Sequence, residues 1–226
     1  KFNQNIESIN AAIKKVKIET VPFTQLYPEG TKAWTYDSRR EIRSPIGLMG
    51  AMDKLDFWMG ENEEGLVASQ ALLAGKPGAG KSYTLHGIII GLAMRYDPDE
   101  LEMYLLDFKE GVEFQIYVDP ERAETTSIND ELNEDKALPH AKVVSIESDR
   151  EFGLSVLQSV QDEIKERGSK FKSAGVSSLK DYRTKTNEKM SRILVVIDEF
   201  QYMFQETDHI TRELNLIFED ITRRGR

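Results

Sequence analysis

The feature that most constrains this chain is a glycine-rich segment at residues 75–82, which fits the pattern G-x-x-x-x-G-K-[ST] of a phosphate-binding loop. Before it, the short apolar run Ala71–Ala74 predicts a buried strand, and after it Tyr83–Tyr96 predicts a helix without proline. Glycines let backbone N–H groups surround a phosphate, and the following helix directs its positive N-terminus at the same oxygens. The segment therefore predicts a nucleotide-phosphate site between a strand and a helix.

Two side chains of this loop carry the expected chemistry. Lys81 is expected to reach the β- and γ-phosphates of a nucleotide, and the Ser82 hydroxyl to ligate Mg²⁺. We expect further nucleotide contacts from the rest of the loop and from the residue after it, namely Gly75, Lys76, Pro77, Gly78, Ala79, Gly80 and Tyr83. The alternative is a glycine-rich turn that binds nothing, and the flanking strand and helix patterns argue against it.

A second signal is the apolar run Ile193–Ile197, which ends in Asp198 and Glu199. Such an unbroken β-branched and aliphatic run is typical of a strand buried on both faces of a parallel sheet. Open α/β sheets bind ligands at the carboxyl ends of their strands. We therefore expect Asp198 to hold Mg²⁺ through water, and Glu199 to orient and deprotonate the attacking water. The alternative is a strand that simply meets solvent at its acidic end, but with the phosphate loop the pattern favours nucleotide hydrolysis.

Composition restricts the other chemistries open to the chain. Its lack of cysteine excludes disulfides and thiolate metal sites. The histidines are scattered along the sequence and predict no metal cluster. The net charge of −9 argues against a broad surface that coats nucleic acid, although a few loops lining a channel could still hold DNA.

The chain carries no sign of a membrane segment or an export signal. No apolar run approaches the length needed to cross a bilayer, and no signal-peptide pattern is present. We therefore expect a cytoplasmic location. Because the sequence begins at Lys1 rather than methionine and stops abruptly at Arg226, we expect it to be an excised part of a longer protein.

The first 45 residues differ in pattern from the rest. An apolar 4-3-4-3 spacing predicts an N-terminal helix, either the end of a coiled coil or an ordinary helix docked on the core. The residues with this spacing are Phe2, Ile6, Ile9, Ile13 and Val16. An irregular stretch with proline and glycine breakers follows. We expect residues 1–45 to be this helix and a linker, and residues 46–226 to be one nucleotide-binding domain.

Within the second region, strand and helix patterns alternate. Ile46–Met59 predicts a hairpin, and Met103–Leu106 and Val143–Ile146 predict strands. Tyr117–Ala137 is polar and acidic and predicts a surface insertion. Alternating strands and helices predict an α/β fold with a mainly parallel sheet and right-handed crossovers.

Two helices are expected around the strand that ends at Asp198. The first begins after Ser148 or Asp149, either of which could cap it. Its buried residues are expected to be Phe152, Val156, Leu157, Val160 and Ile164. The last helix is expected to bury Ile210, Leu214, Ile217, Phe218 and Ile221.

From about Ile46 to Arg226 the chain resembles the motor domain of the FtsK/SpoIIIE family of DNA translocases. The motifs that carry the resemblance are Ala74–Ser82, Leu105–Lys109, Leu138–His140, Phe171–Val176 with Asp181-Tyr182, and Ile197–Phe200. This ordered set is more specific than a phosphate loop by itself. The resemblance implies a RecA-like P-loop fold and an oligomeric, usually hexameric, ATPase that uses ATP and Mg²⁺ to pull double-stranded DNA through a central channel.

The chain also departs from the family pattern. It has Asp107-Phe108-Lys109 where translocases that move chromosomes usually carry Asp-Pro-Lys, and it ends just before the strand on which the family places a γ-phosphate sensor. A divergent branch is therefore expected, with weak ATPase activity from these residues by themselves. Two other functions stay open: a related ATPase that drives protein export in type VII secretion, and a regulatory module that binds nucleotide without hydrolysis. The retention of Glu199 argues against the last.

The end of the last helix carries an arginine cluster, Arg223, Arg224 and Arg226. Ring ATPases commonly complete each site with an arginine from the neighbouring subunit, whose planar guanidinium stabilises transition-state charge. One of these side chains could act in this way. The alternative is a solvated helix end, where arginines interact favourably with the negative end of the helix dipole.

Overall fold

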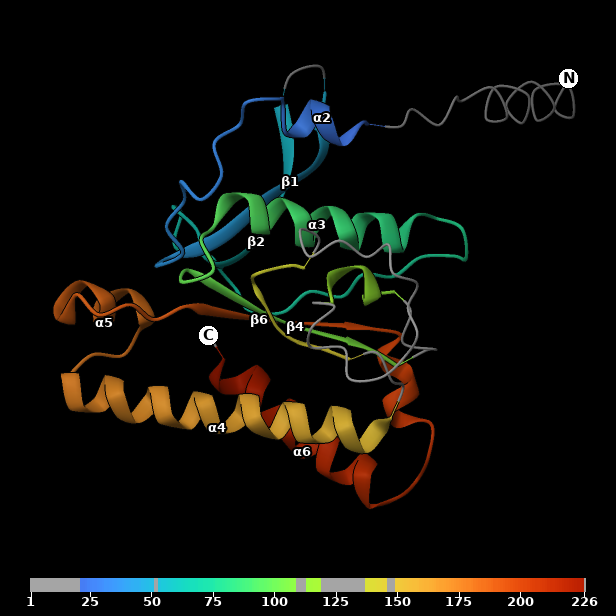
Figure 1. Cartoon of the computed structure of the whole chain (residues 1–226). Coiled ribbons are helices and arrows are strands. Elements are labelled where there is room, and N and C mark those ends of the chain that lie inside the picture. The colour runs from blue at the N-terminus through green and yellow to red at the C-terminus, as the bar shows by residue number, and fades with distance from the viewer. Residues whose placement is uncertain (1–20, 51–52, 109–112, 119–136, 146–148, 226) are drawn as a thin grey trace, which may run out of the picture.

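The computed structural model describes residues 21–50, 53–108, 113–118, 137–145 and 149–225. The predicted N-terminal helix lies outside the described residues, as do Arg226 and residues 119–136 of the predicted insertion. Figure 1 shows the order of the elements along the chain. They are α2 (Phe23–Leu26), β1 (Glu41–Met49), β2 (Asp53–Glu61), β3 (Val67–Ala68), α3 (Lys81–Arg95), β4 (Leu101–Asp107), the 3₁₀ helix η1 (Gln115–Tyr117), β5 (Ala141–Val144), α4 (Arg150–Ala174), α5 (Leu179–Thr186), β6 (Arg192–Asp198), the 3₁₀ helix η3 (Phe200–Phe204) and α6 (His209–Arg224).

A parallel sheet with strand order β5-β4-β6 forms the centre of the molecule. The register pairs Leu101 with Arg192 at one end and Asp107 with Asp198 at the other, so β4 and β6 end side by side in aspartates. The α/β class, the two strands predicted at Met103–Leu106 and Ile193–Ile197, and the parallel sheet are confirmed.

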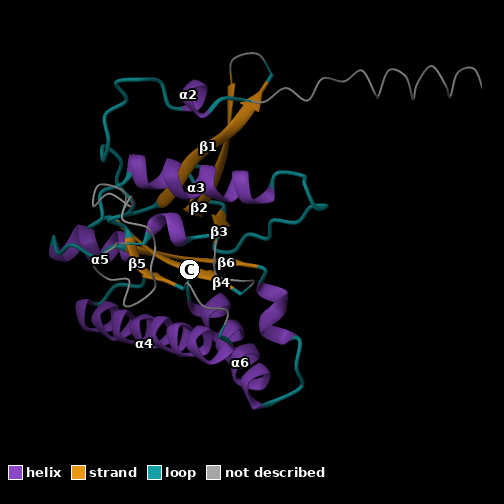
Figure 2. Ribbon diagram, turned by 45° about the vertical axis from the view of Figure 1, so that its right-hand side comes forward, coloured by secondary structure: helices purple, strands orange, loops and turns teal. Residues whose placement is uncertain are grey.

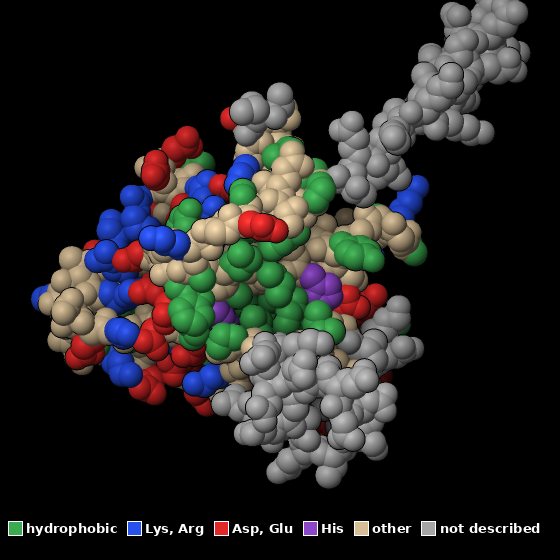
Figure 3. Space-filling view, turned by 45° about the horizontal axis from the view of Figure 1, so that its top comes forward, with side chains coloured by type: hydrophobic (Ala, Val, Ile, Leu, Met, Phe, Trp, Pro, Cys, Tyr) green, Lys and Arg blue, Asp and Glu red, His purple; other side chains and the backbone are tan. Residues whose placement is uncertain are grey.

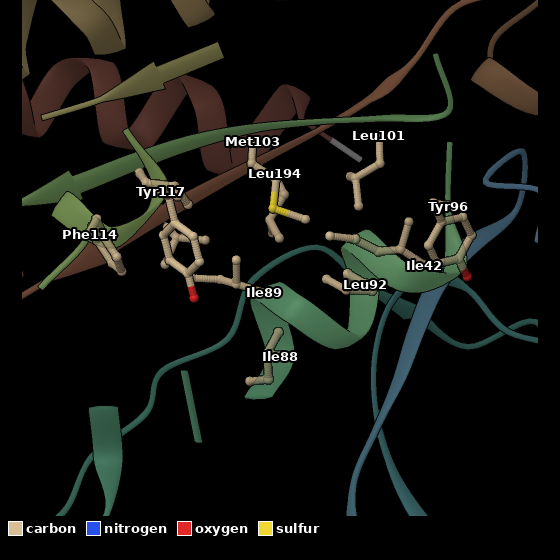
Figure 4. Packing of buried hydrophobic residues seen from close by; sticks show 13 residues of the cluster. Ile42, Ile88, Ile89, Leu92, Tyr96, Leu101, Met103, Phe114, Tyr117 and Leu194 are labelled. Carbon is tan, nitrogen blue, oxygen red and sulfur yellow. The ribbon is translucent and has the colours of Figure 1, made fainter. Parts of the chain in front are cut away.

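Helices cover both faces of this sheet, as Figures 1 and 2 show. Because side chains alternate along a strand, Met103 and Leu105 pack with α3 in one cluster, while Tyr104 and Leu106 pack with α4 and α6 in another. Figure 4 shows the first cluster, in which Met103, Leu194 and Leu101 lie over Ile89 and Leu92 of α3. The first of these two apolar layers thus fixes α3, and with it the phosphate loop, against β4 and β6.

The predicted hairpin is confirmed as β1 and β2, which pair antiparallel and are joined by β3 in a second sheet. β1 crosses the expected boundary between residues 45 and 46 and lies against α3. At their close approach a Cβ on Gly91 would stand 2.2 Å from the Ser44 Oγ and 2.4 Å from the Tyr27 hydroxyl. Only glycine fits there, and the segment before residue 46 packs on the same core as the rest.

The strand predicted at Ala71–Ala74 does not form, and that prediction is wrong. Leu72 and Leu73 are exposed instead, at 74% and 46% of their surface. The preceding residues Val67 and Ala68 pair with β2. The chain before Ala71 therefore belongs to the antiparallel sheet and does not enter the parallel sheet beside β6. An isolated strand has no partner for its backbone N–H and C=O groups, so this run remains irregular.

The helices predicted after the phosphate loop, after Asp149 and at the end of the chain are confirmed as α3, α4 and α6, while the burial of two residues, Phe152 and Tyr117, differs from expectation. Asp149 caps α4 by accepting a hydrogen bond from the Glu151 amide at 2.9 Å, and α6 buries Leu214. Phe152, expected in the core, is 41% exposed, because it lies in the first turn, away from the face that packs on the sheet. Tyr117, expected to begin a surface insertion, is only 4% exposed and belongs to the core cluster under α3.

An ion pair ties the segment before β1 and helix α5 to the start of β4. The Glu100 carboxylate accepts hydrogen bonds from Arg183 Nη1 at 2.8 Å and from the Ser38 amide at 2.9 Å. Burial favours the neutral form of Glu100, but these hydrogen bonds outweigh it and lower its pKa to about 2.

Among the helices of the described ranges, none combines the length and the apolar character needed to span a membrane.

Candidate active site

The phosphate loop is a turn built on two glycines in the left-handed region. Gly78 has φ +74° and Gly80 has φ +92°. A Cβ at either position would meet no atom within 4 Å, so the backbone conformation, and not a lack of space, requires glycine there. The Ala79 amide donates to the Lys76 carbonyl at 3.0 Å and closes the turn. This conformation delivers the chain directly into the first turn of α3.

The N-terminus of α3 is suited to bind an anion. No side chain caps it at Gly80, so its first N–H groups point out of the helix without a capping acceptor. Lys81 and Ser82 open the helix and are half-buried. Nζ of Lys81 donates to the Gly75 carbonyl at 3.3 Å, which places the ammonium over the loop. Tyr83, which follows them, is 87% exposed.

The two carboxylates predicted from sequence stand at the end of β6. Asp198 Oδ1 accepts the Glu199 amide at 3.0 Å. Burial raises the pKa of Asp198 more than this hydrogen bond lowers it, and nearby carboxylates raise it further. A bound divalent cation would offset this accumulation of negative charge.

Glu199 has an unusual backbone. Its φ of +50° and ψ of +40° lie in the left-handed region, which glutamate seldom occupies. Its carboxylate accepts a hydrogen bond from the Gln201 side-chain amide, and its carbonyl accepts the Tyr202 amide at 3.0 Å. The strained turn directs the chain from β6 into η3 directly after Asp198, a feature common at functional sites.

The loop and the carboxylates face the same side of the molecule. In both ribbon views the N-terminal end of α3 and the carboxyl ends of β4 and β6 lie on that side. The Ser82 hydroxyl and the Asp198 carboxylate are oxygen donors of the kind that Mg²⁺ takes, and this ion needs only a few protein ligands because water and phosphate oxygens complete its shell. The described residues contain no cluster of three or more acidic or histidine side chains that could hold a metal by themselves.

The structure adds an acidic residue that the sequence analysis treated only as part of a motif. Asp107 ends β4 opposite Asp198, is 2% exposed, and accepts the Glu113 amide on Oδ2 at 3.1 Å. Glu113 in turn contacts His86 of α3. The signal in the sequence was the pair of apolar runs that both end in aspartate, but the equal register of the two strands is a property of the fold.

Of the predicted arginine cluster, Arg223 and Arg224 lie at the end of α6, and Arg226 lies outside the described residues. Arg223 and Arg224 both pair with Asp220 Oδ1, at 3.1 and 2.6 Å, and their side chains are 66% and 51% exposed. Arg224 lines a cavity of about 1120 Å³, which is also bordered by Arg192–Val195 at the start of β6. That cavity contains neither phosphate-loop residues nor Asp198, so it is separate from the candidate active site.

Comparison with known proteins agrees with this geometry. The model of the FtsK/SpoIIIE family matches residues 29–224. The ESX secretion system protein YukB of Bacillus subtilis is 26% identical over 95% of this chain and 14% of its own length. The DNA translocase FtsK of Streptococcus pyogenes serotype M6 is 28% identical over 57% of this chain and 15% of its own length. The chain therefore spans only about one seventh of these curated relatives.

Solved structures show the same fold. The cytoplasmic domain of the type VII secretion ATPase EccC from Thermomonospora curvata superposes with a TM-score of 0.61 at 23% identity, covering 92% of this chain and 22% of that one. The pCW3 conjugation coupling protein TcpA, in its monomer form with ATPγS, gives a TM-score of 0.57 at 20% identity, covering 92% of this chain and 50% of that one. The central sheet and its phosphate loop thus have the architecture of a P-loop ATPase.

Proposed function

This chain belongs to the FtsK/SpoIIIE family, and from that premise we propose that it is a motor domain whose ATP hydrolysis drives a polymer through an oligomeric ring. The observation that carries the proposal is the arrangement of the site. An uncapped helix N-terminus with Lys81 lies on the same side of the molecule as Asp198 and Glu199. A phosphate-binding element and a carboxylate able to activate water are the two parts that hydrolysis of a phosphoanhydride requires.

Each side chain has a distinct role in the proposed reaction. The N–H groups at the start of α3 and the Lys81 ammonium hold the β- and γ-phosphates and stabilise the charge that develops on them. Ser82 and Asp198 would hold Mg²⁺, which supplies further charge neutralisation at the phosphates when bound. Glu199 orients the attacking water and accepts its proton.

Double-stranded DNA is one candidate cargo. The relatives called DNA translocase FtsK and conjugation coupling protein TcpA support this choice. On the face shown in Figure 3, acidic and basic side chains of the described residues are interspersed rather than gathered into a basic area. DNA would therefore be held by a few loops inside a ring, and not along an open surface. We propose that this ring is a cytoplasmic homo-oligomer, a hexamer.

A polypeptide is the second candidate cargo. The secretion proteins YukB of Bacillus subtilis and EssC of Staphylococcus aureus align with 95% and 86% of this chain, whereas FtsK of Streptococcus pyogenes aligns with 57%. The acidic balance of the chain is compatible with such a cargo. A regulatory module without hydrolysis is disfavoured because Asp198 and Glu199 are both present at the end of β6.

Stimulation of ATPase activity separates the two cargoes. We expect linear duplex DNA added to the oligomeric protein to raise the ATPase rate about tenfold or more at low salt, with the gain falling as salt rises because phosphate contacts are screened. A secretion-signal peptide at the same mass concentration is the matched addition. Stimulation by the peptide and none by DNA would reject the DNA proposal and favour polypeptide transport.

The arginine cluster gives a separate proposal, that Arg223, Arg224 or Arg226 completes the site of a neighbouring subunit. Arg223 and Arg224 pair with Asp220 from exposed positions, at 66% and 51% of their side-chain surface, so either guanidinium could turn to a phosphate of a neighbouring subunit. Mixed rings of Lys81→Ala subunits and subunits lacking the active arginine should regain activity, because some junctions then contain one intact copy of each. If ATPase activity does not recover in mixed rings of confirmed composition for any of the three arginines, then these residues act only at the helix end, where they interact with the negative end of the dipole.

A further inference from the structure

Helix α3 is joined to the segment after β4 by a set of polar contacts, here named the α3 clasp and formed by His86, Glu113 and Tyr117. His86 Nδ1 lies 2.7 Å from the Tyr117 hydroxyl, and His86 Nε2 lies 3.1 Å from Glu113 Oε1. The Glu113 amide donates to Asp107 Oδ2 at 3.1 Å. Asp107 is the register partner of Asp198. The hydrogen bonds thus run from the phosphate-loop helix to Asp107, which ends β4 beside the end of β6.

For an ionised carboxylate and a neutral imidazole, the chemistry of the three groups sets the direction of these hydrogen bonds. An ionised Glu113 carboxylate can only accept, so His86 Nε2 carries the hydrogen. In the neutral imidazole Nδ1 must then be an acceptor, and the Tyr117 hydroxyl donates to it. The clasp therefore uses both nitrogens of one ring, each with a different partner, and sets the orientation of that ring.

Apolar packing places the clasp at the edge of the core. Phe114 is fully buried and Tyr117 is 4% exposed, and both belong to the cluster that includes Ile88 and Ile89 of α3. Figure 4 shows the ring of Tyr117 beside Ile89 with its hydroxyl directed away from the sheet. The two rings fix where η1 lies, while the side chains of His86 and Glu113 stay 25% and 29% exposed.

The α3 clasp lies close to the phosphate loop along α3. His86 follows Lys81 and Ser82 by little more than one helical turn, so a shift of the helix on nucleotide binding would also move His86. Partly exposed polar contacts contribute little to global stability. An apolar side chain of similar size at residue 86 could pack there, so the need to fill space does not account for a histidine with two oriented partners.

We propose that the α3 clasp is a positioning device that couples nucleotide at the phosphate loop to the carboxylates at the ends of β4 and β6. Tyr117 orients His86, His86 holds the Glu113 carboxylate, and the Glu113 amide holds the Asp107 carboxylate at the end of β4, beside Asp198. His86 is thus a positioning residue for the hydrolysis proposed above, and the inference rests on that proposed function.

The first test separates positioning from folding by kinetics on the oligomeric protein. His86→Leu, which keeps similar volume without polar partners, is expected to lower kcat for ATP about tenfold, because small misplacements of reacting groups are costly in rate. KM for ATP and the thermal midpoint are expected to change little. His86→Gln presents one acceptor and one donor and should recover most of kcat. His209→Ala, at an exposed histidine that begins α6, is the matched control and should leave the rate unchanged.

The second test needs no turnover. Amide hydrogen exchange is measured over residues 113–118 with and without ATPγS, in the parent, His86→Leu and Tyr117→Phe, which keeps the buried ring. We expect ATPγS to slow exchange there in the parent and to lose that effect in both variants. An equal slowing in all three proteins would overturn the clasp.

The outcomes distinguish the clasp from the proposed function. A parent that hydrolyses ATP, with kcat unchanged in His86→Leu, rejects the clasp and leaves the motor function standing. A parent that binds ATPγS without hydrolysing ATP rejects the proposed hydrolysis, and the exchange result then decides the clasp by itself as a coupling of nucleotide to residues 113–118. A parent that binds no nucleotide rejects both.

Discussion

Replacing Lys81 with alanine is expected to reduce ATP turnover to background, a loss of roughly 10³-fold for a cation that stabilises the transferred phosphoryl group. Lys81 opens α3, and its Nζ already lies over the loop through the Gly75 carbonyl. The ammonium would exchange this neutral acceptor for phosphate oxygens, which bind a cation more strongly. No other lysine of the loop begins the helix, so we expect no substitute for it.

The measurement is steady-state ATP hydrolysis together with nucleotide affinity by a fluorescent analogue. Lys189→Ala is a suitable control, because Lys189 is 77% exposed and pairs with Asp99 before β4, away from the phosphate loop. Parental turnover in Lys81→Ala would show that the phosphate loop is not the catalytic site.

Glu199→Gln is expected to have a different phenotype, with ATP and Mg²⁺ still bound and hydrolysis reduced roughly 10²- to 10³-fold. The amide has nearly the same size as the carboxylate but cannot accept a proton from water. Two main-chain hydrogen bonds hold the turn at Glu199, from its amide to the Asp198 carboxylate and from the Tyr202 amide to its carbonyl, and a glutamine Oε1 can still accept from the Gln201 side chain. Glutamine should therefore preserve the turn and the Asp198 carboxylate.

Single-turnover hydrolysis and equilibrium binding, measured side by side, check this expectation. Glu206→Gln is the matched control, because Glu206 lies in the connection between η3 and α6 and its side chain is 68% exposed. Hydrolysis by Glu199→Gln at the parental rate would assign the base to another group, and Asp107 would become the first residue to examine.

The sequence by itself determined the parts of this protein whose signals are local. Gly78 and Gly80 of the phosphate loop are needed for left-handed backbone conformations, and that requirement depends on φ at each residue rather than on distant contacts. The run Ile193–Ile197 is apolar throughout because both faces of β6 are covered, and the spacing of Ile210, Leu214 and Ile217 follows one side of α6. Family membership follows from the same ordered motifs.

The tertiary structure decided which strands pair and which side chains come into contact. Ala71–Ala74 has the composition of a strand but no strand partner among the described residues, because the preceding Val67 and Ala68 pair with β2. Tyr117 is next to a polar, acidic stretch in sequence, yet it packs under α3 because Phe114 and its neighbours pack on the sheet. The juxtaposition of Asp107 with Asp198, and the contacts of His86 with Glu113, join residues far apart in the chain. Residue patterns report local conformation and burial, whereas strand partners and side-chain contacts depend on how the whole chain packs, which no local pattern contains.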